Sequence, residues 1–214
     1  MIKAAIFDLD GVIVDTAHYH FIAWQRLAHE LGIEFTEHEN ERLKGVSRMR
    51  SLEIILELGG KALPEAEKEA LATRKNAWFV EYIQAIRPDE IFPGVKQLIQ
   101  QLRRGGVKVA LASSSKNARL VLRNLQIEDL FDGYVDGTMI THSKPHPEIF
   151  LSAAAQLGVQ PQACVVFEDA EAGVEAALAA GMKCVGVGAP VNVGKAHRVV
   201  SNTAEVTAAD IQNM

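Results

Sequence analysis

The sequence contains little cysteine. Only Cys164 and Cys184 occur in 214 residues, and both stand in apolar runs that are typical of buried strands. Two such thiols cannot form the disulfide framework of a small secreted protein, and we expect them to be inert and buried rather than a disulfide or metal pair. This composition favours a reducing compartment, and we expect a cytoplasmic protein.

The sequence also lacks an excess of positive charge and any long apolar segment. Its 22 Lys and Arg against 27 Asp and Glu give a formal net charge of −5, and no basic tail is present. We therefore expect no nucleic acid and no membrane surface as a partner. No stretch approaches the ~20 apolar residues of a membrane span, and no charged N-terminal region precedes an apolar one. Any positive electrostatic potential must therefore be local, which suits a small anionic substrate. We also expect the protein to be a monomer.

Short apolar runs are what the sequence does contain. Five of them predict β-strands, at 3–7, 107–112, 133–136, 163–167 and 184–187, and a sixth short strand is expected at 198–200. The runs are nearly continuous rather than alternating, which favours strands covered on both faces. Helical patterns at 95–102, 149–157 and 174–178 separate several strands, with Pro147 expected in the first turn of the second helix and Gly158 at its end. The sequence predicts an α/β fold with a doubly wound parallel sheet.

The segment between the first two strands breaks this alternation. Residues 16–89 have helical patterns almost throughout, and 65–87 contain neither glycine nor proline. Such a length is too great for a simple crossover. We predict a helical domain at 16–89, inserted through linkers near 14–16 and 88–93 into a catalytic core made of 1–15 and 90–214.

Polar residues follow the predicted strands. Asp8 and Asp10 follow the first strand, and Glu168 and Asp169 follow the fourth. Ligands of open parallel sheets bind at the carboxyl ends of the strands, so these carboxylates should meet at one edge. Like charges held this close are costly without a cation, and all-oxygen ligation is what Mg²⁺ prefers. Asp-x-Asp-Gly is also compatible with a simple turn; a calcium loop is disfavoured because Val12 and Val14 are apolar.

Two further polar segments reach the same edge. Residues 113–117, Ser-Ser-Ser-Lys-Asn, follow the second strand and open a helix, where free backbone N–H groups can bind phosphate. The alternative is a plain helix cap, which needs only one of the serines. Lys144 stands in Ser-Lys-Pro-His-Pro and offers a compact positive charge for carboxylate or phosphoryl oxygens. A lysine in such a segment, taken by itself, is more often an exposed surface lysine.

These motifs carry a family resemblance. Phe-Asp8-Leu-Asp10-Gly-Val, the Ser113 turn, Lys144-Pro and Glu168-Asp169 resemble, in order and spacing, the four signature motifs of the haloacid dehalogenase (HAD) superfamily. The resemblance implies a Rossmann-like core with a C1-type helical cap. Within the superfamily the chain is similar to the isomerases that interconvert β-D-glucose 1-phosphate and glucose 6-phosphate through glucose 1,6-bisphosphate. The supporting strings are those at 15–21, 23–24, 43–48, 74–76 and 112–117.

The resemblance implies a role for each motif. Asp8 would be the nucleophile that becomes a phospho-aspartate, and Asp10 the general acid–base. Mg²⁺ would be held by Asp8, the backbone carbonyl of Asp10 and Asp169, with Glu168 nearby. The candidate residues for phosphate, substrate and the closed site are Thr16, His20, Trp24, Lys44, Gly45, Val46, Ser47, Arg48, Lys75, Ser113, Ser114, Ser115, Lys116, Asn117 and Lys144.

The resemblance implies a different role for each part of this set. Ser113 and Lys144 would hold the transferring phosphate. The other phosphate would bind at Arg48, Ser115, Lys116 and Asn117. Thr16, His20, Lys44 and Lys75 would shape the closed site. The chain departs from the family pattern at Met49, where an acidic residue is usual, and at Ser114, where alanine is usual; both leave the preferred sugar phosphate open.

Alternatives remain for several residues and for the activity. His20 could be a packed core histidine, and Trp24 is interpreted as cap core more than as a sugar platform. His142 and His146 have the spacing of a metal pair, but the prolines beside them disfavour helical ligation, and we interpret them as loop histidines. The rival activity is a sugar-phosphate phosphatase with the same nucleophile. A non-catalytic sugar-phosphate sensor is disfavoured because it would need neither Asp8 nor Asp10.

Overall fold

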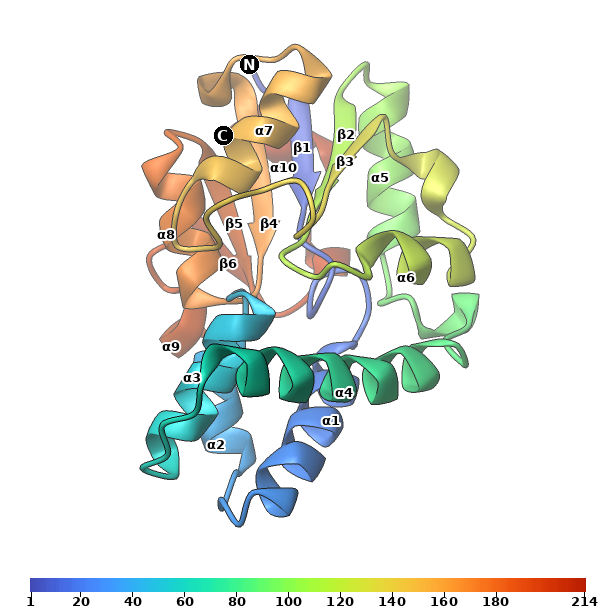
Figure 1. Cartoon of the computed structure of the whole chain (residues 1–214). Coiled ribbons are helices and arrows are strands. Elements are labelled where there is room, and N and C mark those ends of the chain that lie inside the picture. The colour runs from blue at the N-terminus through green and yellow to red at the C-terminus, as the bar shows by residue number, and fades with distance from the viewer.

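A single six-stranded parallel sheet forms the centre of the computed structural model, which describes all residues 1–214 (Figure 1). Its order is β3-β2-β1-β4-β5-β6. The strands are β1 (Ala4–Phe7), β2 (Lys108–Ala112), β3 (Gly133–Val135), β4 (Cys164–Glu168), β5 (Lys183–Val187) and β6 (Arg198–Val200). Every predicted strand is present within one residue of its expected bounds. The first strand thus lies in the middle, between two strands from much later in the chain.

Helices cover both faces of this sheet. Alternate side chains of the central strands pack into two separate apolar clusters, one with α5 (Val95–Arg104), α6 (Ala118–Asn124) and α10 (Ala208–Gln212). The other contains α7 (Glu148–Leu157), α8 (Glu171–Ala179) and α9 (Pro190–Val193). Because both faces are buried, strand residues of either parity must be apolar, which accounts for the continuous apolar runs. The doubly wound α/β prediction is confirmed.

The remaining helices lie between β1 and β2. They are α1 (Ala17–Glu30), α2 (Glu37–Asn40), α3 (Arg48–Leu58) and α4 (Glu65–Ile83), with a 3-10 turn, η1 (Glu41–Leu43). They enclose an apolar cluster of their own, and Figure 1 shows them below the carboxyl ends of the strands. Ala23, Phe79 and Ile83 pack instead into the core cluster of the sheet. We call these helices the cap and the rest of the chain the core.

Short 3-10 turns connect several core elements: η2 (Pro88–Glu90), η3 (Glu128–Leu130), η4 (Pro161–Ala163) and η5 (Thr203–Glu205). The expected place of Pro147 is wrong by one residue. Pro147 is the N-cap of α7, where its carbonyl accepts the N–H groups of Phe150 and Leu151. Gly158 ends the helix in the left-handed conformation, φ 65°, as predicted.

Both cysteines are buried and unpaired, as expected. Burial raises the pKa of Cys164 to about 11, so its thiol stays protonated and unreactive at neutral pH. None of the helices combines the length and the apolar character that crossing a bilayer requires.

Candidate active site

The topology brings the predicted acidic and basic residues to one edge of the sheet. Asp8 and Asp10 follow β1, and Glu168 ends the neighbouring strand β4. Ser113 follows β2, and Lys144 lies in the connection from β3 to α7. These strand ends face the cap in Figure 1. Four segments that are distant in sequence therefore build one site.

Lys144 joins two carboxylates from different strands. Its Nζ donates to Asp8 Oδ1 at 2.5 Å and to Glu168 Oε1 at 3.2 Å, and its side chain is fully buried. Burial alone would lower the pKa of Lys144, but the two carboxylates outweigh it and raise that pKa, so the ammonium stays charged. The alternative of an exposed surface lysine is wrong.

Three carboxylates lie close enough to share a cation. Oxygens of Asp8, Glu168 and Asp169 all lie within 4.8 Å of one another. Burial, and then the charge of Asp8, raise the pKa of Asp169 to about 7. One buried oxygen, Glu168 Oε2, has no hydrogen-bond partner. Three carboxylates offer hard oxygen donors, which fit a divalent metal ion. The positive charge of such an ion would offset the negative charge that the carboxylates bring together.

Asp10 occupies a different electrostatic position from Asp8. Burial, and then the charges of Asp8 and Asp169, raise its pKa well above the usual value, which favours the protonated carboxyl group. Its Oδ1 is buried and has no partner within the protein. A buried carboxyl group that keeps its proton can act as a general acid.

Two glycines make room for the acidic residues. A Cβ on Gly11, which has φ +79°, would meet Asp169 Oδ2 at 2.2 Å. A Cβ on Gly173 in α8 would meet Glu168 Oε1 at 1.4 Å. The glycine of Asp-x-Asp-Gly therefore supports both a tight turn and the approach of another carboxylate, so the turn and the acidic site are one structure.

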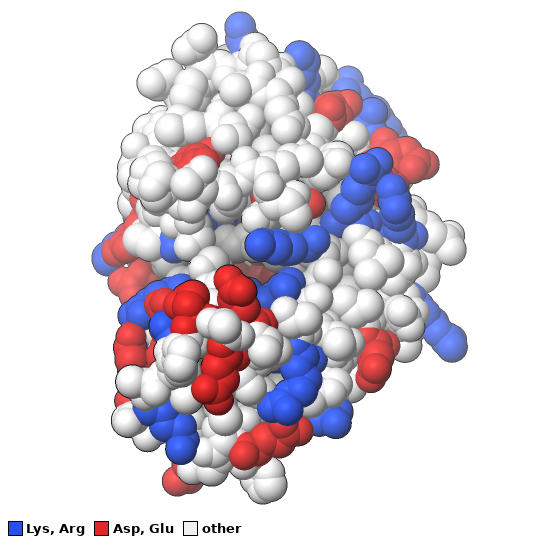
Figure 2. Space-filling model, viewed as in Figure 1, with Lys and Arg blue, Asp and Glu red and all other residues white.

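A cavity of about 530 Å³ lies between core and cap. Figure 2 shows basic side chains at this junction on the face drawn. The predicted residues that line the cavity are Asp8, Asp10, His20, Trp24, Lys44, Gly45, Val46, Ser47, Arg48, Lys75, Ser114, Ser115, Lys116 and Asp169.

Five predicted residues do not line the cavity. Four of them are buried: Thr16, Ser113, Lys144 and Glu168. The Ser113 hydroxyl accepts the backbone N–H of Ser115 at 3.2 Å, which braces the turn after β2. Asn117 donates through its side-chain amide to Asn76 Oδ1 in α4 at 2.8 Å.

Lys75 contacts His20 and Trp24 in the cap, with Lys75 and Trp24 buried and His20 half-buried. Lys75 is 1% exposed, its Nζ lies 2.7 Å from His20 Nδ1, and it lies 4.4 Å from the centre of the Trp24 ring. Trp24 belongs to the apolar cluster of the cap and also lines the cavity. His20 stacks on Phe79 at 3.8 Å. His20 and Trp24 therefore pack against other side chains of the cap and also line the cavity, so both of the alternatives weighed for them hold.

Direct contacts close the cap onto the core. The Ser114 hydroxyl donates to the carbonyl oxygen of Gly45 at 2.8 Å, and Lys44 Nζ lies 3.9 Å from Asp169 Oδ2. Lys44 also pairs with Glu41 at 3.0 Å. Ser114 and Lys44 therefore connect the two parts of the chain at the cavity.

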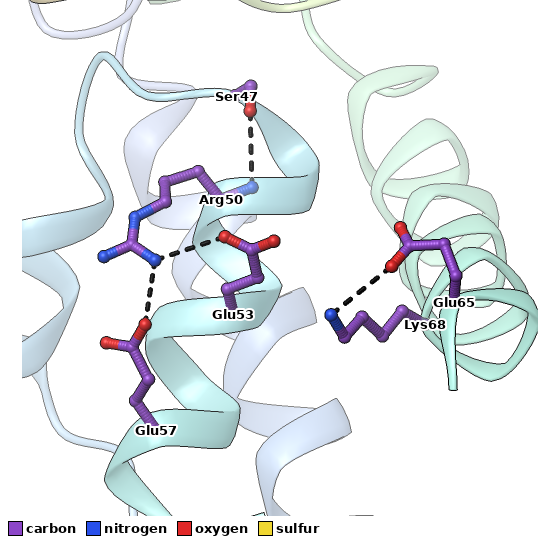
Figure 3. Close-up of polar contacts among 6 residues, drawn as sticks. All are labelled: Ser47, Arg50, Glu53, Glu57, Glu65 and Lys68. Carbon is purple, nitrogen blue, oxygen red and sulfur yellow. Dashed lines mark hydrogen bonds and ion pairs between the residues drawn. The ribbon is translucent and has the colours of Figure 1, made fainter. Parts of the chain in front are cut away.

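Arg48 and Arg50 stand in the same turn of α3 but differ in surroundings. Ser47 caps this helix by accepting the N–H of Arg50, and the Arg50 guanidinium pairs with Glu53 and Glu57 on the outer surface (Figure 3). Arg48 lines the cavity, and no carboxylate lies within ion-pair distance of it. Partial burial lowers the pKa of Arg48, but a guanidinium stays charged at neutral pH. Arg48 is therefore an unneutralised cation facing the cavity.

Sequence reasoning missed several cavity residues: Asn40, Ser51, Glu69, Thr73, Thr141 and Ser143. Glu69 and Thr73 stand at i and i+4 on one face of α4, but they lie six and two residues before Lys75, so helical spacing from Lys75 does not point to them. Thr141 and Ser143 belong to the irregular β3–α7 connection, where no periodicity exists to place them.

Comparison with known proteins places the chain in a family. A family model described as haloacid dehalogenase-like hydrolase matches residues 2–181. The chain belongs to this family, and the fold and the acidic edge of the sheet agree with it.

Two relatives resemble the whole chain closely. The chain is 48% identical to the β-phosphoglucomutase of Bacillus subtilis over 96% of its own length and 92% of that protein. A crystal structure of β-phosphoglucomutase from Clostridium difficile superposes with a TM-score of 0.97 at 46% identity and covers 100% of this chain and 96% of that one. A phosphorylated carbohydrates phosphatase of Thermotoga maritima is 35% identical over 99% of this chain and 97% of that protein.

Proposed function

We propose that the chain is a β-phosphoglucomutase, an isomerase that interconverts β-D-glucose 1-phosphate and glucose 6-phosphate. Its similarity to two β-phosphoglucomutases over nearly the whole chain supports this function. One structural observation carries the proposal: the unneutralised Arg48 of the cap and the Asp8–Asp10 pair of the core line the same cavity. A second phosphate contact is needed only when the sugar carries a phosphate at both ends. We assign the core to 1–15 and 90–214 and the cap to 16–89.

Two aspartates carry the chemistry in this proposal. A phosphoryl group on Asp8 passes to the 6-hydroxyl of glucose 1-phosphate, and Asp10 takes the hydroxyl proton. The resulting glucose 1,6-bisphosphate leaves the phosphoryl site, turns round and rebinds with its other phosphate there. Asp8 then attacks the 1-phosphoryl group, the bond to the sugar oxygen breaks, and Asp10 returns its proton to that oxygen. Glucose 6-phosphate leaves, and Asp8 is phosphorylated again.

Charge neutralisation is the work of the surrounding residues. Asp8, Asp169 and the backbone carbonyl of Asp10, with Glu168 beside them, would hold Mg²⁺, which when bound supplies positive charge at the phosphoryl oxygens. Lys144 contacts Asp8 and Glu168 in the structure and is placed to stabilise the negative charge of the transferring group.

The distal phosphate needs a separate cradle. Arg48, Ser115 and Lys116 line the cavity and would bind it. Asn117, whose amide is hydrogen-bonded to Asn76, holds the cap against the end of α6 in this proposal. Because Arg48 belongs to the cap and Lys116 to the core, a bound phosphate would favour the closed arrangement and exclude water.

One assay tests the proposal against a sugar-phosphate phosphatase, which the Thermotoga relative keeps as the second candidate. The protein is incubated with Mg²⁺ and β-glucose 1-phosphate, with and without a trace of glucose 1,6-bisphosphate. We expect glucose 6-phosphate to form, faster with the bisphosphate, and little free phosphate. Stoichiometric release of free phosphate without glucose 6-phosphate would establish the phosphatase instead.

A further inference from the structure

A second group of metal-ligand side chains lies outside the cavity. His142, His146 and Glu148 stand at the end of the β3–α7 connection, and ligand atoms of all three lie within 4.8 Å of one another. His142 Nδ1 lies 2.9 Å and His146 Nδ1 3.9 Å from the same oxygen, Glu148 Oε2. The two imidazole rings are 4.6 Å apart. Three ligand groups of two kinds therefore converge on one point.

Glu148 is fixed in place by the backbone. The N–H of Thr141 donates to Oε1 and the N–H of His142 to Oε2, both at 2.8 Å. These bonds hold the carboxylate in its charged form and orient it, as an outer shell does in metal sites. The two histidine side chains are 63% and 52% exposed, so an ion from solvent can reach their nitrogens. Pro145 and Pro147 restrict the backbone between the ligands.

We propose that His142, His146 and Glu148 form a binding site for a first-row transition-metal ion such as Zn²⁺, with water at the open position. Two imidazoles and a carboxylate are ligands that Zn²⁺, Ni²⁺ and Cu²⁺ favour over Mg²⁺. Ligands at the usual zinc distances in tetrahedral geometry lie about 3.3 Å apart, and the separations of 2.9 and 3.9 Å bracket that value. The all-oxygen site at Asp8 has the opposite preference, so the two sites select different ions.

Binding requires small local changes. His142 takes the tautomer that carries its proton on Nε2, so that Nδ1 is free for the ion, which replaces the contact between Nδ1 and Glu148. His146 Nδ1 accepts the N–H of Glu148 at 3.3 Å, a long contact that the ion displaces. The sequence interpretation as loop histidines is correct about their location, but a turn, rather than a helix, brings them together.

The location gives the site a consequence for the cavity. Lys144 stands midway between the two histidines, and Thr141 and Ser143 of the same segment line the cavity. An ion bound by His142 and His146 would link the two residues that flank Lys144 by two positions on either side. Metal occupancy would therefore reduce the mobility of the segment that carries Lys144.

The test uses the full-length protein at saturating Mg²⁺, titrated with Zn²⁺ and followed by calorimetry and by imidazole ¹⁵N NMR. The chain has 7 histidines, and we expect the ring signals of His142 and His146 alone to shift. His142→Asn and His146→Asn should each weaken this binding by at least the about 10–100-fold that loss of an outer-shell partner costs. The matched control is His38→Asn, which replaces an exposed cap histidine outside the group and should change nothing.

A second control separates this site from the acidic one. Asp169→Asn removes a carboxylate of the acidic site and should leave the His142 and His146 shifts intact. Zinc binding of equal strength in His142→Asn and His146→Asn, or zinc binding lost in Asp169→Asn, would overturn the proposal. So would the absence of any imidazole shift at zinc concentrations that saturate the calorimetric signal.

Discussion

Lys75 Nζ lies 2.7 Å from His20 Nδ1 between α4 and α1, where Lys75 is buried and His20 is half-buried. Burial, and then the charge of Lys75, lower the pKa of His20 well below its usual value. The ring is therefore neutral at pH 7, and its Nδ1 accepts a hydrogen bond from the lysine. This contact links helices α1 and α4 of the cap, and protonation of His20 would break it.

Stability should therefore depend on pH through His20. Its folded pKa lies below the unfolded value of about 6.5, so the unfolded chain binds the extra proton first. The contribution is present above about pH 6.5 and is lost as the pH falls below it, by up to about 1.4 kcal/mol per pH unit. Urea unfolding between about pH 5 and pH 8 measures this slope. His20→Gln should flatten it, and an equal slope in both proteins would contradict the prediction.

Asp8→Asn should abolish turnover and leave the fold unchanged, because an amide is neither a usable nucleophile nor a good metal ligand. Mass spectrometry of acid-quenched protein should detect a phosphorylated species in the wild type and none in the variant. Undiminished activity in Asp8→Asn would end the covalent mechanism.

Asp10→Asn should slow phosphoryl transfer by ~10²–10⁴-fold, the usual contribution of general acid–base catalysis. Magnesium affinity should change much less, because the proposed contact to the ion is the backbone carbonyl. Transfer rates at several Mg²⁺ concentrations distinguish the two effects. A weaker metal affinity with an unchanged rate at saturation would mean that Asp10 is a ligand through its side chain.

Arg48→Ala should lower mutase turnover of β-glucose 1-phosphate by about one to two powers of ten, since a charge-assisted contact is worth roughly 1.5–3 kcal/mol. Hydrolysis of acetyl phosphate, which has no second phosphate, should fall far less. Arg50→Ala is the matched control, because Arg50 pairs with Glu53 and Glu57 on the outer surface of the same helix (Figure 3). Equal losses of both activities in Arg48→Ala would remove the distal-phosphate role.

Gly173→Ala should destabilise the protein by about 1–3 kcal/mol, the usual cost of overpacking. The added methyl group would take the position of Glu168 Oε1 and push that carboxylate away from Lys144. Magnesium affinity should fall as well, which calorimetry measures. The control is Gly105→Ala at the end of α5, where a Cβ meets nothing closer than 3.4 Å. Comparable stability and metal affinity in the two variants would show that Glu168 can move without loss.

Much of this architecture could be predicted because strands buried on both faces appear in the sequence as short, nearly continuous apolar runs. The position of Lys144 beside Asp8 followed from the rule that ligands gather at strand ends, and the contact at 2.5 Å confirms it. The burial of Lys75 was not predictable, because a lysine in a helix is ordinarily exposed and only the packing of α4 on α1 encloses it.

The contacts between core and cap could not be predicted from the sequence either. Ser114 differs from the family pattern, and its bond to the Gly45 carbonyl depends on how the two parts of the chain are oriented. The pairing of Asn117 with Asn76 depends on the same orientation. His142 and His146 were interpreted as loop histidines because their spacing was tested against a helix, and Glu148 was not considered with them, whereas a turn that contains two prolines brings the three side chains together.

The central place of β1 has a consequence for biosynthesis. β1 is made first, yet its two neighbours β2 and β4 come from residues 108–112 and 164–168, and Lys144 is 136 residues from Asp8. On the ribosome the cap helices and their own apolar cluster can assemble early, while β1 stays unpaired until β2, which ends at Ala112, has emerged. Such non-local pairing also slows refolding. The nascent chain therefore gains its acidic site only when Asp169 has emerged, so a product truncated before Asp169 lacks this site.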